Sequence, residues 1–141
     1  MPCADTSFLF SLYRKDAHSG AAHARLAKAA RPLLLSPLNE FELGNALRLA
    51  EYQGLLATGE ATRRLEAFAE DYATGLWRHS DIALKEITEE AGRLSATHTI
   101  AGGHRAFDIL HVAHARLVAP KEFLSFDANQ LRLAKAAGLR C

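Results

Sequence analysis

Short apolar segments alternate with longer segments of helical periodicity along most of this chain. The clearest apolar segments are residues 33–35 and 122–126, and a serine-proline pair or an aspartate follows each of them as a helix-entry signal. Strands that are separated by helices form a parallel sheet, whose two faces the helices must cover. The alternation therefore predicts an α/β three-layer sandwich with more helix than strand.

The sequence predicts five strands, seven helices and one loop. Strands are expected at residues 2–5, 33–35 and 122–126, with a weak strand at 76–81 and a terminal edge strand at 139–141. Helices are expected from the Asp-Thr-Ser entry at 5–7 to residue 15, and at 16–30, 37–54, 60–73, 82–94, 104–118 and 127–137. Residues 95–105 contain two adjacent glycines and no clear period, so we expect a flexible loop, and such loops often serve the substrate.

Length and composition predict one compact domain over residues 1–141. With 49% hydrophobic residues, the chain can bury a full core without disulfides or a structural metal. The 17 Lys and Arg against 16 Asp and Glu give a formal charge of +1, so a nucleic acid would have to be attracted by local basic patches. Basic residues that could serve this purpose are Arg14, Lys15, Arg25, Lys28, Arg31 and Arg48.

Cysteine usage and hydropathy predict a cytoplasmic protein. Cys3 and Cys141 lie at opposite ends of the chain and show no metal-binding spacing, which is typical of two reduced thiols. The sequence has no run of 18 apolar residues and no signal-peptide pattern at its start. We therefore expect no membrane association.

Four acidic residues stand at positions that favour a common site. Asp5 and Asp127 each follow an expected strand, and the carboxyl ends of parallel strands form the functional edge of an open sheet. Glu42 lies six residues past Ser36 in the next helix, and Asp108 lies near the start of an apolar helix. An unpaired carboxylate in an apolar helix is costly, so Asp108 needs a cation, hydrogen-bond donors or a water-filled cleft.

A divalent cation would reconcile four carboxylates in one cleft. Like charges a few ångströms apart raise one another's pKa, and a bound cation removes that conflict. Oxygen-only ligands favour Mg²⁺ or Mn²⁺, and such clusters suit the hydrolysis of phosphodiesters. Taken singly, Asp5 and Asp127 are also ordinary helix caps, and Glu42 is an ordinary solvated helix residue.

The segments around these acids resemble the PIN-domain nucleases, and among them the VapC-type toxins of bacterial toxin–antitoxin pairs. The resemblance covers nearly the whole chain and is poorest at residues 54–103. The matching segments are ADTSFLFSLY with Asp5, SPLNEFELGNAL with Glu42, RAFDILHVAHA with Asp108 and FLSFDANQLRLAKAAGL with Asp127.

This resemblance implies a flavodoxin-like fold and a divalent-metal-dependent endoribonuclease. It implies that Asp5, Glu42, Asp108 and Asp127 bind Mg²⁺ or Mn²⁺ and are the catalytic acids. It also implies an RNA substrate, a cognate antitoxin and a homodimer. Carried over to this site, the hydroxyls of Thr6, Ser7 and Ser125 would orient carboxylates, whereas Ser7 and Ser125 judged individually are better explained as caps and packing groups. Arg105 would contact substrate phosphate or pair with an acid of the cleft.

Other residues admit two interpretations each. His111 and His114 are spaced as zinc ligands but lack a third ligand, so core or interface histidines are the default. Tyr72 and Trp77 would stack on a base or pack in the core. The Leu9, Leu12 and Tyr13 stripe and the alanine-rich second helix would form a dimer or antitoxin surface, or cover the sheet.

Two further functions remain as alternatives to a ribonuclease. A non-catalytic module with the same fold would bind RNA or a protein without turnover, and its binding would not depend on a metal. An acid-cluster phosphatase would need an Asp-x-Asp nucleophile pattern, which the sequence lacks.

Overall fold

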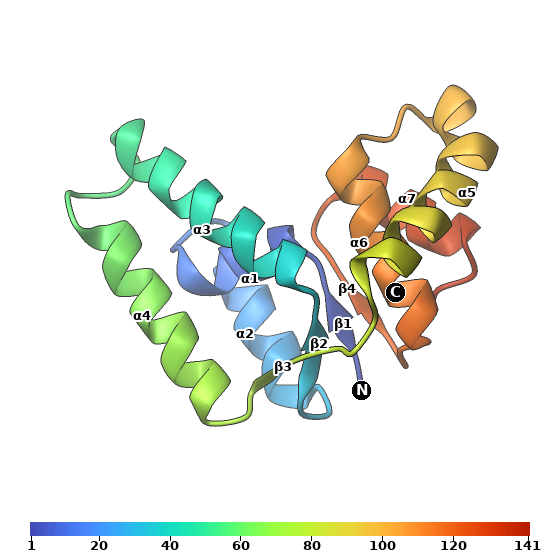
Figure 1. Ribbon diagram of the computed structural model, residues 1–141. Helices are drawn as coiled ribbons and strands as arrows, with labels where there is room; N and C mark the ends of the chain where they lie inside the picture. Colours follow the sequence, from blue (N-terminus) through green and yellow to red (C-terminus); the bar gives the residue numbers. More distant parts are fainter.

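The computed structural model describes residues 1–141 as four short strands and seven helices (Figure 1). In chain order they are β1 (Cys3–Ala4), α1 (Thr6–Tyr13), α2 (Ser19–Lys28), β2 (Leu33–Leu35), α3 (Pro37–Tyr52), α4 (Glu60–Ala73), β3 (Trp77–His79), α5 (Leu84–Gly102), α6 (Ala106–Val118), β4 (Phe123–Leu124) and α7 (Ala128–Ala136).

The four strands form one parallel sheet in the order β3-β2-β1-β4. The chain builds the sheet outward from β1 to β2 and β3, then returns to place β4 on the other side of β1. Strand order therefore reverses between β1 and β4, where open α/β sheets form their functional crevice. This position matters because β1 and β4 lead into Asp5 and Asp127.

Side-chain alternation along β2 divides the core into two layers. Leu33 and Leu35 point into one buried cluster and Leu34 into the other, as the two-residue period of a strand requires. The first cluster lies under α1–α4 and the second under α5–α7, and Figure 1 shows these helix groups on opposite sides of the sheet. The predicted α/β three-layer sandwich is therefore confirmed.

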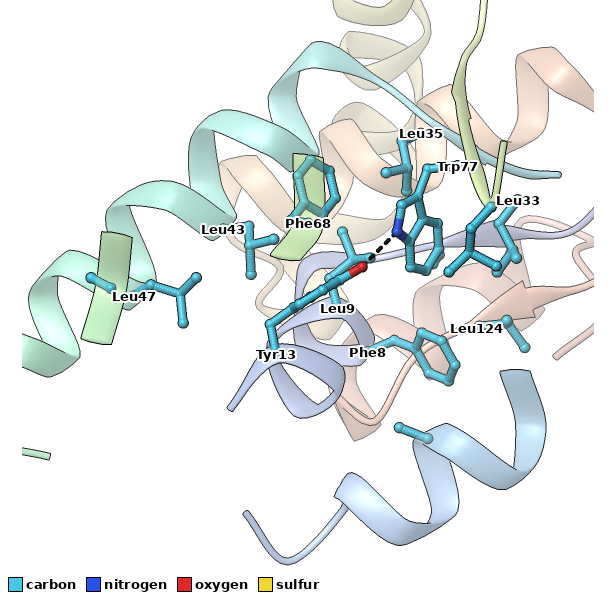
Figure 2. Close-up of a cluster of buried hydrophobic side chains, with 14 residues drawn as sticks. Phe8, Leu9, Tyr13, Leu33, Leu35, Leu43, Leu47, Phe68, Trp77 and Leu124 are labelled. Atoms are coloured by element: carbon cyan, nitrogen blue, oxygen red, sulfur yellow. Dashed lines mark hydrogen bonds between the residues drawn. The ribbon is translucent and has the colours of Figure 1, made fainter. Parts of the chain in front are cut away.

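Two consecutive hydrogen bonds join Trp77, Tyr13 and Asp71 at the first cluster, and Figure 2 draws the one between Trp77 and Tyr13. The indole nitrogen of Trp77 donates to the Tyr13 hydroxyl at 2.7 Å, and that hydroxyl donates to an Asp71 carboxylate oxygen at 2.6 Å. Trp77 is 1% exposed, so it packs in the core rather than offering a stacking surface. Leu9 and Tyr13 are also buried, which means that their face of α1 covers the sheet.

Two of the expected elements are wrong. Residues 95–102 are not a flexible loop, because α5 continues to Gly102 and ends where Gly103 adopts a left-handed conformation with φ of 66°. The two glycines therefore mark a helix end. Residues 139–141 form no strand, although Phe123 N–H donates to the Arg140 carbonyl at 2.8 Å.

Several boundaries also shift by a few residues. The second helix begins at Ser19 instead of residue 16, because the Asp16 side chain accepts from the His18 N–H and the Ser19 hydroxyl donates to the Arg14 carbonyl. These bonds fix a turn before the helix. The helix expected from residue 104 begins at Ala106. None of the helices combines the length and the apolar character needed to cross a membrane.

Candidate active site at the carboxyl edge of the sheet

Pairing of β1 with β4 brings two of the four acids to one edge. Ala4 is in register with Leu124, and the Asp5 N–H continues the ladder by donating to the Leu124 carbonyl at 3.0 Å. Asp5 then caps α1, and Asp127 caps α7 by accepting from the Gln130 N–H at 2.8 Å. Both acids therefore begin helices, as the cap interpretation predicts, and both lie at the expected edge.

Asp5 is completely buried and fully hydrogen-bonded. Its carboxylate accepts from the Ser7 hydroxyl at 2.8 and 2.9 Å, from the Ser125 hydroxyl at 2.6 Å and from the Phe8 N–H at 2.9 Å. Burial raises the pKa of Asp5 to about 6, although these hydrogen bonds oppose the shift. The fold thus keeps a carboxyl group in an environment that disfavours its charge.

The two serines that contact Asp5 are themselves oriented by the backbone. Ser7 Oγ accepts from the Phe126 N–H at 3.0 Å, and Ser125 Oγ accepts from the Asp127 N–H at 3.0 Å. Each hydroxyl also donates to the Asp5 carboxylate, which can only accept when it is ionised. The two serines thus connect Asp5 and α1 to the segment after β4, and their role in orienting Asp5 for catalysis stays a prediction.

Glu42 projects from α3 toward α6. Its Oε2 lies 3.3 Å from His111 Nε2. Partial burial would raise the pKa of Glu42, but hydrogen bonds from His111 and Thr6 and the nearby charge of Arg105 outweigh burial and lower it. Glu40, two residues earlier, instead lies 3.1 Å from His79. Glu40 and Glu42 therefore lie on different faces of α3.

Asp108 is not the unpaired buried charge that its apolar neighbours suggest. It lies in the first turn of α6, where the helix dipole favours a negative charge, and its Oδ2 lies 3.2 Å from Arg105 Nε. Its side chain is 12% exposed, so one edge still reaches solvent. Of the two roles expected for Arg105, the structure shows the ion pair.

Three of the four acids line one cavity of about 210 Å³. Glu42, Asp108 and Asp127 come from α3, α6 and the start of α7, and Thr6, Ser7 and Arg105 line the same cavity. Asp5 does not line it, but it bonds directly to Ser7, which does. A second recess of about 360 Å³ opens beside Glu42, Arg105 and Asp108.

The donor chemistry of this cavity fits a hard divalent cation. No group of three His, Cys, Asp or Glu side chains is placed so as to hold a metal ion directly. Mg²⁺ does not require such a group, because it keeps several waters and usually binds through one or two carboxylates. Three carboxylates around a solvent-connected cavity, against the one positive charge of Arg105, supply oxygen donors and an excess of negative charge.

Nothing in the sequence places Asn39 or Gln130 at this site, and from the sequence His111 is expected only as a core or interface histidine or a zinc ligand. Asn39 and His111 contact each other beside Glu42, and Gln130 lines the cavity and donates to the Asp108 carbonyl at 3.3 Å. The available signal was spacing: His111 is three residues after Asp108 and so shares its helix face. His114 lies apart and contacts Ser80 at 2.6 Å, so the two histidines do not share a zinc site.

A larger cavity, of about 670 Å³, lies between α3 and α4. Glu40, Arg48, Tyr72 and His79 are among its lining residues, and it contains none of the four acids. Arg48 is therefore the one expected basic residue that lines a described cavity, and it does not line that of the acids.

Comparison with known proteins identifies the family of the chain and a solved structure of similar fold. The family model of the PIN domain matches residues 3–136. Among solved structures, the chain is similar to Mycobacterium tuberculosis VapC20, described as a toxin that cleaves the sarcin-ricin loop. The two chains are 20% identical, the similarity covers 99% of this chain and 96% of VapC20, and the TM-score is 0.72. No curated protein matches the sequence significantly. The chain belongs to the PIN domain family.

Proposed function

We propose that this protein is a divalent-metal-dependent endoribonuclease and the toxin of a toxin–antitoxin pair. The observation that carries the proposal is the cavity at the strand-order reversal, where Glu42, Asp108 and Asp127 converge beside the buried Asp5. Membership of the PIN domain family and structural similarity to an RNA-cleaving toxin support the same conclusion.

In this proposal the four acids form the catalytic centre with Mg²⁺ or Mn²⁺. A bound divalent ion would activate water and neutralise charge on the leaving oxygen. Glu42, Asp108 and Asp127 would supply oxygen donors from the cavity wall. Asp5 lies behind Ser7, which lines the cavity and donates a hydrogen bond to the Asp5 carboxylate. Arg105, which is largely exposed, would move from Asp108 to a substrate phosphate.

Asp108→Asn tests the proposal. We expect the substitution to reduce RNA cleavage with Mg²⁺ or Mn²⁺ about 100-fold or more, the size of loss seen when an electrostatic group of the active site is removed. Glu40→Gln is the matched control, because Glu40 is an acid of the same region that lies on the other face of α3. Cleavage of a sarcin-ricin loop RNA and of total RNA provides the measurement.

Two different results would contradict this proposal, one for the site and one for the activity. Full activity of Asp108→Asn would reject the site assignment. Tight RNA or protein binding that a chelator does not change, with no cleavage by the parent chain, would favour the non-catalytic module instead.

The partners follow from the same proposal. We propose a cognate antitoxin that restrains the nuclease in the cytoplasm, and a homodimer as the assembled form. Growth arrest on induced expression, relieved by Asp5→Asn or by a short neighbouring gene, would support the toxin role. Size-exclusion chromatography with light scattering would measure the dimer.

A further inference from the structure

His111 is a buried histidine that the catalytic proposal leaves unused. It is 2% exposed and lies in the middle of α6, between the start of α3 and the start of α1. Its ring nitrogens contact three side chains: Asn39 on one side, and Glu42 and Thr6 on the other. Which nitrogen carries the hydrogen determines what His111 can do for Glu42.

The orientation of the Asn39 amide is fixed by two independent backbone groups. Asn39 Oδ1 lies 2.9 Å from the Ser36 nitrogen, which only donates. Asn39 Nδ2 lies 3.2 Å from the Ala4 carbonyl oxygen, which only accepts. Reversing the amide would oppose donor to donor and acceptor to acceptor, so the nitrogen of the amide must face β1 and His111.

The fixed amide determines the tautomer of His111. Asn39 Nδ2 lies 3.3 Å from His111 Nδ1, and because Nδ2 has only hydrogens to offer, Nδ1 must accept. A neutral imidazole that accepts at Nδ1 carries its hydrogen on Nε2.

The hydrogen on Nε2 is directed at the carboxylate of Glu42. Nε2 lies 3.3 Å from Glu42 Oε2, which can only accept, and 3.2 Å from Thr6 Oγ1. The Thr6 hydroxyl can direct its own hydrogen at Glu42, so Thr6 and His111 both present donors to this carboxylate. Asn39 in turn is held by the capping box at the start of α3, which also contains Ser36. The backbone at the start of α3 is thus connected to Glu42 through the side chains of Asn39 and His111.

We infer that Asn39 and His111 are positioning residues for Glu42: Asn39 holds His111 as the Nε2–H tautomer, and His111 donates that hydrogen to Glu42. Glu42 also lines the cavity, so this arrangement would hold its carboxylate at the cavity wall where a cation would bind. The consequence for metal binding rests on the proposed function, whereas the tautomer follows from the contacts of the folded chain alone.

The tautomer can be read directly in the parent protein. Long-range ¹H–¹⁵N NMR spectra at pH 7.5, in the absence of metal, distinguish protonated from unprotonated ring nitrogens. We expect His111 to show an unprotonated Nδ1 and a protonated Nε2. A protonated Nδ1, in either the other neutral tautomer or the cation, would overturn the inference.

Asn39→Asp tests the cause of the tautomer. The replacement keeps an oxygen for the Ser36 N–H but places a second acceptor opposite His111 Nδ1. We expect Nδ1 to become protonated, because a carboxylate oxygen cannot donate. An unchanged spectrum in a folded Asn39→Asp protein would show that Asn39 does not control the ring.

Two replacements of His111 test the effect on Glu42. His111→Leu removes the donor, and His111→Gln keeps an N–H at the end of a side chain of similar reach. We expect His111→Leu to weaken Mn²⁺ binding about 10- to 100-fold, as is typical for groups that orient metal ligands, and His111→Gln to restore most of it. Equal Mn²⁺ affinity of the parent and the leucine variant would reject the role.

The experiments separate this inference from the nuclease proposal. If the parent protein shows the expected tautomer but neither binds Mn²⁺ nor cleaves RNA, the proposed function fails and the Asn39–His111–Glu42 arrangement stands. If the parent binds Mn²⁺ and cleaves RNA with His111 in the other tautomer, only the positioning inference fails. Circular dichroism confirms that each variant is folded.

Discussion

At the scale of single residues, Asp5 carries a charge that the fold disfavours. The pKa of its carboxyl group is raised from 3.8 to about 6, mainly by burial. The folded chain therefore binds the proton more tightly than the unfolded chain does, and the ionised carboxylate destabilises the fold above pH 6. This destabilisation fades as the pH falls from 6 to 4. Such a cost is typical of residues kept for activity.

Asp5→Asn should therefore be tolerated by the fold at neutral pH. In the presence of a chelator, we expect the variant to be at least as stable as the parent at pH 7.5, and to lose about 3 kcal/mol relative to the parent by about pH 4. Urea unfolding at both pH values measures the difference. Asp81→Asn, at an exposed position, should show no such dependence. An equal loss of stability at both pH values would mean that the Asp5 carboxylate is structural.

At the scale of secondary-structure elements, the chain from Trp77 through Tyr13 to Asp71 joins β3, α1 and α4. Trp77 and Tyr13 lie among apolar side chains, including Phe68, whose ring centroid is 5.5 Å from that of Tyr13 (Figure 2). Both hydrogen bonds depend on the one hydroxyl of Tyr13. These hydrogen bonds therefore join three elements on the side of the sheet that α3 also covers.

Tyr13→Phe should lower the free energy of unfolding without changing the contacts of the four acids at the candidate site. The substitution leaves the buried Trp77 N–H without an acceptor and Asp71 without its donor, which costs about 1–3 kcal/mol. Tyr52→Phe is the control, because Tyr52 is 89% exposed. The free energy of unfolding in urea is the measurement, and equal values for the two variants would show that the link contributes nothing.

At the scale of the whole molecule, acid should unfold the protein partly through His114. This histidine lies between α6 and the end of β3, and burial lowers its pKa to about 4. In the unfolded chain His114 becomes protonated near pH 6.5, whereas in the folded chain it stays neutral until about pH 4. Stability contributed by neutral His114 is therefore complete above pH 6.5 and is lost as the pH falls toward 4.

His114→Gln should flatten this dependence. We expect the parent to lose about 3 kcal/mol more stability than the variant between pH 7 and pH 4, since a shift of one pKa unit corresponds to about 1.4 kcal/mol. The contribution of Asp5 has the opposite sign but is present in both proteins and cancels. His23→Gln, at an exposed position, should leave the slope unchanged. Parallel curves for the parent and His114→Gln would contradict the assignment.

The order of apolar segments and helix-entry signals was enough to predict the architecture and the edge of the sheet at which to look for a site. Alternating apolar segments and helix-entry signals predicted the parallel sheet covered on both faces, because strand and helix periods are local properties of the chain. The positions of Asp5 and Asp127 after strands placed them at one edge. Their catalytic roles, with those of Glu42 and Asp108, stay predictions.

The contacts that hold these residues in place form when the chain folds. Residues 95–102 are helical although none of them belongs to a buried cluster: they extend a helix that packs through Ile87, Ala91 and Leu94, and adding residues to a formed helix is easier than starting one. That Asp5 is buried behind Ser7, and that Asn39 reaches His111 across 72 positions, follows from strand order and helix crossing. Hydrogen bonds between residues so distant in the chain leave no local pattern, because their partners meet only in the folded state.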